Sequence, residues 1–151
     1  ICANDVDIAI ELAKTKSLID IRRSQYDDLG DNISLWPAPF DIFWTAHVSA
    51  ERQALIRCGL FDERFNSWGG EDVELGIRLF KDNNKFEVDK SICSIHWPHQ
   101  TDDSELEDKV QQAGVARLKI KAMHKLWQTS FYDQETGDAI YSLNRVINQL
   151  G

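Results

Sequence analysis

The sequence predicts a mixed α/β domain, because two kinds of apolar pattern are interleaved along it. Aromatic and β-branched residues gather in residues 40–50 and again in residues 84–99, and runs of this composition are typical of buried strands. Apolar residues at helical spacing occupy much of the remaining chain. Since strands and helices alternate, we expect an α/β or α+β arrangement in which residues 1–151 form a single domain.

Five segments are predicted to be helical. Residues 5–28 have apolar positions near helical spacing and begin with Asp5, a suitable N-cap. A short helix over residues 50–58 follows the first strand and ends at Gly59. The remaining helices are predicted over residues 71–83, 103–127 and 138–149. Segments rich in Gly, Pro and polar residues separate them and predict loops.

Composition and charge narrow the range of partners. The formal net charge is −8 and the pI is near 4.9, so nucleic-acid phosphates would be repelled and we expect no nucleic-acid partner. No apolar run approaches the roughly 20 residues that span a bilayer, so we expect no membrane span. Three widely spaced cysteines do not form a disulfide framework and indicate a reducing compartment.

The segment with most chemical information is FDERFNSWGGED, at residues 61–72. Its two adjacent glycines let the backbone adopt positive φ and pass close to a ligand, while Trp68 offers a flat apolar face that suits a sugar ring. Glu71 and Asp72 open the next helix, where the dipole and free N–H groups keep a carboxylate ionised, as a general base requires. A capped helix after a glycine turn would show the same pattern without a function.

A second informative segment, SIHWPHQ, covers residues 94–100. His96 and His99 lie where the predicted strand ends, and a neutral imidazole near carboxylates can bind a divalent metal. Histidines in such positions also serve as hydrogen-bonded packing residues. The pattern alone leaves both interpretations open.

Taken together, three parts of the chain resemble the carboxyl-terminal catalytic segment of GT-A glycosyltransferases. They are HVSAERQALIRCGLFDERF, SWGGEDVELGIRL and CSIHW, which extend from Asp41 to about His99. The resemblance is strongest to the galactosyltransferase-type module of glycosyltransferase families 2 and 7. It implies that the chain forms the carboxyl-terminal half of a GT-A nucleotide-sugar transferase fold, with added helices.

The resemblance also implies a role for each matched residue. Asp72 corresponds to the catalytic base that takes the proton from the acceptor hydroxyl, and Glu71 to a neighbouring carboxylate that helps to hold the acceptor. His96 corresponds to the metal ligand, with His99 as the alternative. The expected sugar-binding residues are Trp68, Gly69, Gly70, Trp44 and Thr45.

The function that follows from the resemblance is transfer of a galactose- or N-acetylhexosamine-type sugar from a UDP-sugar to a saccharide acceptor. The Glu-Asp pair is typical of members that invert the anomeric centre, and the family requires Mn²⁺ or Mg²⁺. His47 and Val73 differ from the residues that are usual at the matching positions of the family. The identity of the transferred sugar is therefore not determined by the resemblance. We expect a cytoplasmic bacterial protein of polysaccharide biosynthesis.

The family's nucleotide-binding region, which ends in Asp-x-Asp, has no clear counterpart here. Asp5-Val6-Asp7 matches the Asp-x-Asp pattern, but we interpret it as a helix cap. We therefore expect the donor-binding half to be absent from these residues and to be supplied by other domains of a longer polypeptide.

One alternative to a transferase is a degenerate, non-catalytic sugar-binding or interaction module. Another is an unrelated metal hydrolase that uses Glu71, Asp72, His96 and His99.

Overall fold

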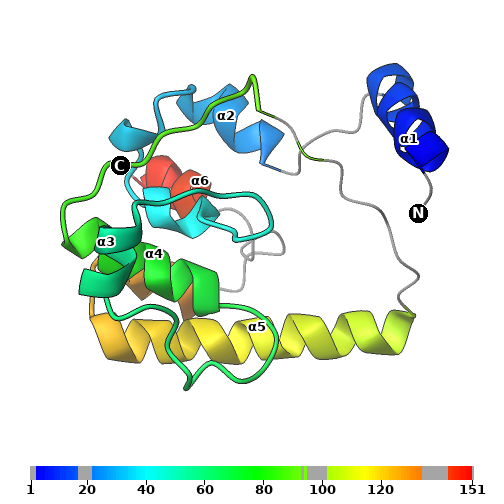
Figure 1. The fold of residues 1–151 in the computed structure, drawn as a ribbon. Helices are drawn as coiled ribbons and strands as arrows, with labels where there is room; N and C mark the ends of the chain where they lie inside the picture. Colours follow the sequence, from blue (N-terminus) through cyan, green and yellow to red (C-terminus); the bar gives the residue numbers. More distant parts are fainter. Residues whose placement is uncertain (1–2, 17–21, 93, 95–101, 134–142, 151) are drawn as a thin grey trace.

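The computed structural model describes residues 3–16, 22–92, 94, 102–133 and 143–150. Within these ranges the chain forms α-helices and short 3₁₀ helices, and no β-strand (Figure 1). The α-helices are α1 (Ala3–Lys16), α2 (Arg23–Leu29), α3 (Arg52–Arg57), α4 (Glu71–Lys81), α5 (Asp103–His124) and α6 (Leu143–Leu150). The 3₁₀ helices are η1 (Ile33–Leu35), η2 (Pro39–Ile42) and η3 (Gln128–Asp133).

Most of the predicted helices are confirmed. The segments 50–58, 71–83 and 103–127 correspond to α3, α4 and α5. The segment 138–149 corresponds to α6 from Leu143 onward, and its residues 138–142 lie outside the described ranges. The described residues of the helix predicted over 5–28 belong to α1 and α2, and residues 17–21 lie outside the described ranges. Asp5 lies in the first turn of α1 rather than at its N-cap. Asp102 does cap α5, because its side chain accepts a hydrogen bond of 2.8 Å from the backbone N–H of Glu105.

The strand predicted over residues 40–50 is wrong. Pro39 begins the 3₁₀ helix η2, whose turn is closed by a hydrogen bond of 3.2 Å from Phe43 N–H to the Phe40 carbonyl. Phe40 and Ile42 of this run are buried, as predicted, whereas Val48 is exposed. Burial of the first residues alone does not distinguish a strand from an irregular core segment. The predicted strand in 84–99 is also missing from residues 84–92 and 94, and its other residues lie outside the described ranges. The overall mixed α/β class stays a prediction.

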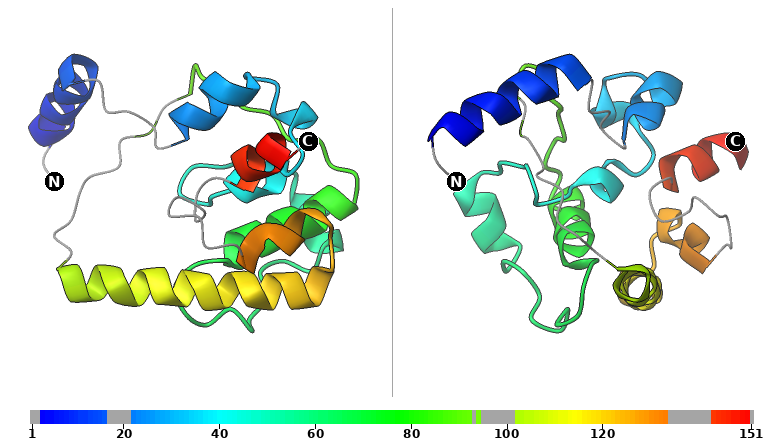
Figure 2. Two further views of the ribbon diagram at one scale, coloured as in Figure 1. Left: turned by 180° about the vertical axis from the view of Figure 1, so that it is seen from behind. Right: turned by 90° about the vertical axis from the view of Figure 1, so that its right-hand side faces the viewer.

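Helix α4 lies at the centre of the packed part of the molecule. It packs against η2 on one side and against α5 on the other, and α5 runs as a long rod along the edge (Figure 2). Leu75 and Ile77 of α4, Phe40 of η2 and Ile120 of α5 are almost fully buried and form the middle of the core. The N-terminal helix α1 stands apart from this group in Figure 1.

The contact between α4 and η2 depends on Gly76. A Cβ atom at this position would lie 3.0 Å from Phe43 Cβ and 3.1 Å from the Phe40 carbonyl oxygen. Any other residue would therefore require Phe40 and Phe43 to shift by a few tenths of an ångström for α4 to stay this close to η2. This approach places the first turn of α4 beside residues 44–46.

Side chains from two other elements hold the segment before η2. Asn144 of α6 accepts a hydrogen bond of 2.8 Å from Ala38 N–H and donates one of 3.0 Å to the Ala38 carbonyl. Gln128 of η3 donates a hydrogen bond of 2.9 Å to the Pro37 carbonyl. These amides provide the partners that a neighbouring strand would supply in a sheet.

The structure also bears on membrane-spanning helices and on the state of the cysteines. No helix within the described ranges is long and apolar enough to cross a membrane. Cys58 lies within the described ranges and is a free thiol. Cys2 and Cys93 lie outside these ranges.

Substituting Gly76 should test the α4–η2 contact. We expect Gly76→Ala to lower the free energy of unfolding by roughly 1–3 kcal/mol, because the new methyl group meets the Phe40 carbonyl oxygen and the Cβ atoms of Phe40 and Phe43, which move only with the backbone. Gly114 in α5 is the matched control, since a Cβ there meets nothing within 4 Å. Gly114→Ala should raise stability by up to about 1 kcal/mol through helix propensity. Equal effects of the two substitutions in urea denaturation would contradict the proposed close contact.

Candidate functional site

A cavity of about 370 Å³ opens where the start of α4, the turn before it, the residues after η2 and the middle of α5 meet. The structure brings all seven predicted catalytic and sugar-binding residues into its wall, although they come from two separate parts of the sequence. We call it the acidic cavity, and it is lined by Asp41, Trp44, Thr45, Ala46, Trp68, Gly69, Gly70, Glu71, Asp72, Val73, Ala113, Arg117, Ile120 and Tyr132.

The glycine turn is shaped by its contact with α5. Gly69 and Gly70 both have positive φ, at 85° and 91°. A Cβ on Gly70 would lie 2.6 Å from Ala116 Cβ, so the turn fits only because one partner lacks a side chain and the other is small. The Trp68 N–H donates a hydrogen bond of 2.7 Å to Gln112 of α5. The turn therefore holds Trp68 at the cavity wall with its side chain 46% exposed.

Asp72 is fixed by backbone groups on both sides of the cavity. Its Oδ1 accepts a hydrogen bond of 2.7 Å from Val73 N–H, and its Oδ2 accepts one of 3.3 Å from Thr45 N–H. The second bond links the start of α4 to the segment that carries Trp44. The indole N–H of Trp44 in turn donates to the Asp41 carbonyl at 2.9 Å.

The pKa of Asp72 shifts in the direction opposite to the one that its place at a helix N-terminus predicts. A helix N-terminus was expected to keep this carboxylate ionised, but burial raises the pKa of Asp72, the charge of Glu71 raises it further, and the hydrogen bonds from Val73 and Thr45 only partly offset these effects. A raised pKa makes the carboxylate a stronger base. A carboxylate with a raised pKa at this position therefore accepts a proton from a hydroxyl more readily.

Three polar residues of the acidic cavity were not predicted as site residues. Asp41 is 4% exposed, and its Oδ1 accepts a hydrogen bond of 3.0 Å from the Tyr132 hydroxyl. Arg117 of α5 lies over the Tyr132 ring, with 5.8 Å between its guanidinium carbon and the ring centroid. Burial raises the pKa of Asp41 to about 6, and Arg117 and the Tyr132 hydroxyl act against that rise. One signal was available in the sequence: Asp41 is a charged residue between Phe40 and Ile42, inside a run that was expected to be buried.

The predicted metal ligands, His96 and His99, lie outside the described residues. Within the ranges that the structure does describe, no group of three or more His, Cys, Asp or Glu side chains is placed to hold a metal ion. The acidic cavity contributes carboxylates, which are suitable ligands for Mn²⁺ or Mg²⁺, but they do not make up a site by themselves.

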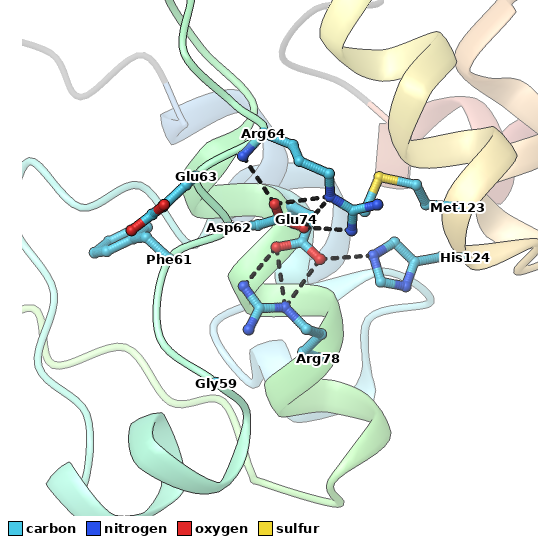
Figure 3. Close-up of a pocket in the computed structure, with 9 residues that line it drawn as sticks. All are labelled: Gly59, Phe61, Asp62, Glu63, Arg64, Glu74, Arg78, Met123 and His124. Atoms are coloured by element: carbon cyan, nitrogen blue, oxygen red, sulfur yellow. Dashed lines mark hydrogen bonds and ion pairs between the residues drawn. The ribbon is translucent and has the colours of Figure 1, made fainter.

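A second cavity, of about 710 Å³, lies on another side of α4 and contains none of the predicted site residues (Figure 3). Glu74, 1% exposed, receives hydrogen bonds from Arg78 and lies 2.9 Å from Nε2 of His124. Burial raises the pKa of Glu74, but the contacts with His124 and Arg78 outweigh it, and the net pKa is lowered. Asp62 and Arg64 form another pair, as Figure 3 shows. Because these charged side chains are paired with each other, we interpret them as structural contacts that hold α4, α5 and the loop before α4 together.

The chain is similar to several glycosyltransferases, of which three are described here. It is 38% identical over 78 residues to the hyaluronan synthase of Pasteurella multocida, covering 52% of this chain and 8% of that protein. It is 47% identical over 58 residues to the chondroitin synthase of P. multocida strain Pm70, covering 38% of this chain and 6% of that protein. It is 36% identical over 101 residues to the validoxylamine A glucosyltransferase of Streptomyces hygroscopicus subsp. jinggangensis, covering 67% of this chain and 22% of that protein.

These similarities relate the chain to glycosyltransferases and support sugar transfer in general. The chain spans less than a quarter of the length of each of these three relatives. No family model matches the sequence. No solved structure matches it either.

The buried carboxyl of Asp41 should make stability depend on pH. Its pKa is about 6 in the folded chain and 3.8 at its ordinary value, so the folded state binds more protons between these two limits. Stability should therefore fall as pH rises from about 4 to about 6, by up to roughly 3 kcal/mol. In Asp41→Asn this loss should disappear, so that the variant gains stability relative to the parent between pH 4 and pH 7 in thermal melts. The exposed Asp103→Asn serves as control, and a parallel pH profile for Asp41→Asn and the parent would contradict the assignment.

Proposed function

We propose that the chain is the acceptor-side, catalytic-base portion of an inverting glycosyltransferase. It would transfer a galactose- or N-acetylhexosamine-type sugar from a UDP-sugar to a hydroxyl of a saccharide acceptor. The observation that carries the proposal is the acidic cavity, where the half-buried carboxyl of Asp72, with its raised pKa, shares the wall with Trp44 and Trp68 in a chain related to glycosyltransferases.

The proposed proton transfer uses Asp72. As the acceptor hydroxyl oxygen forms its bond to the anomeric carbon, the bond from that carbon to the UDP oxygen breaks. The hydroxyl proton passes to the Asp72 carboxylate, and UDP leaves with the bonding electron pair. Since Thr45 and Val73 N–H groups hold both carboxylate oxygens, the base is oriented before the acceptor arrives.

Aromatic and acidic groups support the binding of a saccharide. An indole face covers the apolar side of a sugar ring, and carboxylates accept hydrogen bonds from hydroxyl groups. Glu71, next to Asp72 in the cavity wall, is placed for the second task. Both features are compatible with a non-catalytic sugar-binding module as well, and only the proton-transfer step separates the two functions.

Metal dependence and the binding of the UDP group are further parts of the proposal. A bound Mn²⁺ or Mg²⁺ would neutralise charge on the leaving diphosphate. Its ligands would include His96, or alternatively His99, with additional groups from outside the described residues. We propose that the UDP group is bound by other parts of a longer polypeptide, in the GT-A arrangement, because the sequence offers no clear counterpart of the nucleotide-binding region.

Substituting Asp72 should separate binding from transfer. In the full-length protein, Asp72→Asn should lower kcat by about 10²–10⁴-fold while the affinity for UDP-sugar and acceptor stays within a few-fold, since the amide keeps the shape but cannot accept the proton. For the parent, kcat/KM should fall as pH decreases through the raised pKa of Asp72. Asp103→Asn, at the exposed start of α5, is the control.

Three outcomes are distinguishable in a transfer assay with UDP-sugars and Mn²⁺. Transfer that is lost in Asp72→Asn and kept in Asp103→Asn supports the base. Transfer that persists in Asp72→Asn excludes Asp72 as the base. Saccharide binding without any transfer by the parent protein would instead identify a non-catalytic module.

A further inference from the structure

Helix α5 contacts the loop before α4 through side chains on one of its faces. The Trp68 N–H donates a hydrogen bond of 2.7 Å to Oε1 of Gln112. Lys119 donates a hydrogen bond to the Arg64 carbonyl, and its ammonium lies 4.4 Å from the centroid of the Phe65 ring. Gln112 and Lys119 are seven residues apart, so their side chains leave the same face of α5, about two turns from each other. The loop is therefore attached to α5 at both Arg64 and Trp68.

The part of the loop that follows Trp68 is a pair of glycines. Both have positive φ, and a Cβ on Gly70 would lie 2.6 Å from the Cβ of Ala116. A Cβ on Gly69 would lie 3.8 Å from the Cβ of Ala113. Glycines populate more backbone conformations than other residues, so they do not select one turn geometry by themselves. Contacts with α5 therefore help to select the geometry that the turn adopts.

Gln112 binds the residue that directly precedes these glycines. The indole of Trp68 is 46% exposed, so packing holds it only in part. The direction of the indole therefore depends on the Trp68 backbone, and the N–H of that backbone is the group that Gln112 binds. Trp68 lies in the wall of the acidic cavity together with Asp72, whereas the Gln112 side chain is not part of the described lining. Gln112 thus affects a ligand of the cavity through Trp68 rather than by direct contact.

We propose that Gln112 is a positioning residue for saccharide binding: it fixes the Trp68 backbone so that the indole faces the sugar whose hydroxyl reacts at Asp72. The inference rests on the proposed function and adds to it the residue of α5 that holds the sugar-binding Trp68 in place. Loss of the Gln112 hydrogen bond frees the turn to adopt other conformations, and saccharide binding must then restore the original one. The carboxylate of Asp72 is held by other groups, so proton transfer from a bound acceptor is unaffected.

Three substitutions in α5 isolate this contact. Gln112→Met keeps the length of the side chain and removes the acceptor oxygen, whereas Gln112→Glu retains an acceptor oxygen. Gln111→Met is the matched control, because Gln111 is the neighbouring glutamine, is exposed, and points about 100° away around the helix. The indirect route is tested by introducing Gln112→Met a second time, in a protein that already carries Trp68→Ala.

The measurements use the full-length protein. Methyl β-glycosides of glucose, galactose, glucuronic acid, N-acetylglucosamine and N-acetylgalactosamine are titrated by NMR, and the glycoside that the parent binds most tightly gives the Kd. Transfer to the same glycoside from UDP-galactose and UDP-N-acetylgalactosamine with Mn²⁺ gives kcat. We expect Gln112→Met to raise the Kd about three- to tenfold and to leave kcat at saturating glycoside within about twofold. Gln112→Glu and Gln111→Met should stay within about twofold of the parent in both quantities.

The double variant shows whether the effect passes through Trp68. In the Trp68→Ala protein, Gln112→Met should change the Kd by less than about twofold, because the side chain that it positions is gone. The inference is overturned by an unchanged Kd in Gln112→Met, by an equal loss of affinity in Gln111→Met, or by an undiminished loss in the Trp68→Ala protein. A fall in kcat with an unchanged Kd would overturn it too, since Gln112 would then act on the base.

Failure of this inference and failure of the proposed transferase give different results. A parent protein that transfers sugar, with a Gln112→Met variant that binds acceptor equally well, would keep the transferase and reject the role of Gln112. A parent protein that binds a glycoside and transfers no sugar, with affinity lost in Gln112→Met, would reject the transferase and keep the role of Gln112. A parent protein that neither binds nor transfers would reject both.

Discussion

The buried backbone of residues 36–44 is the constraint on which the acidic cavity depends. This segment supplies Asp41 and Trp44, yet it runs through the core without a neighbouring strand. Its peptide groups must therefore find partners elsewhere. Asn144 pairs with both polar groups of Ala38, and Gln128 pairs with the carbonyl before it. Distant elements thus fix the path of the segment, and the cavity wall follows from that path.

Packing around α4 decides the chemistry of its carboxylates. Asp72 and Glu74 are two residues apart, and burial acts on both in the same direction, but the net pKa is raised for Asp72 and lowered for Glu74. The difference lies in their partners. Glu74 contacts Arg78 and His124, whereas Asp72 has backbone N–H groups and the carboxyl of Glu71. Glu74 is stabilised as an anion, whereas Asp72 has the raised pKa that suits the proposed base.

Sequence reasoning was most successful where a pattern is local. The helices α3, α4, α5 and α6 follow from apolar spacing, and the residues around WGGED were placed in one site because that short pattern resembles a family. The strand over 40–50 failed because its composition reports burial, which a 3₁₀ turn in the core satisfies equally well. Arg117 and Tyr132 could not be predicted, since their role depends on α5 and η3 packing beside Asp41, and nothing local to either residue shows it.

The same packing explains why a helix N-terminus did not lower the pKa of Asp72. The dipole effect is greatest for exposed groups near the first turn and contributes about 0.3–1 kcal/mol. Removing a carboxylate from water costs several kcal/mol when no cation compensates it. At Asp72 burial is the largest cause of the raised pKa, and the neighbouring charge that raises it further is the carboxyl of Glu71. A hydroxyl that approaches Asp72 therefore supplies a hydrogen bond that the protein does not. The interaction that would bind an acceptor is thus also the one along which its proton would move.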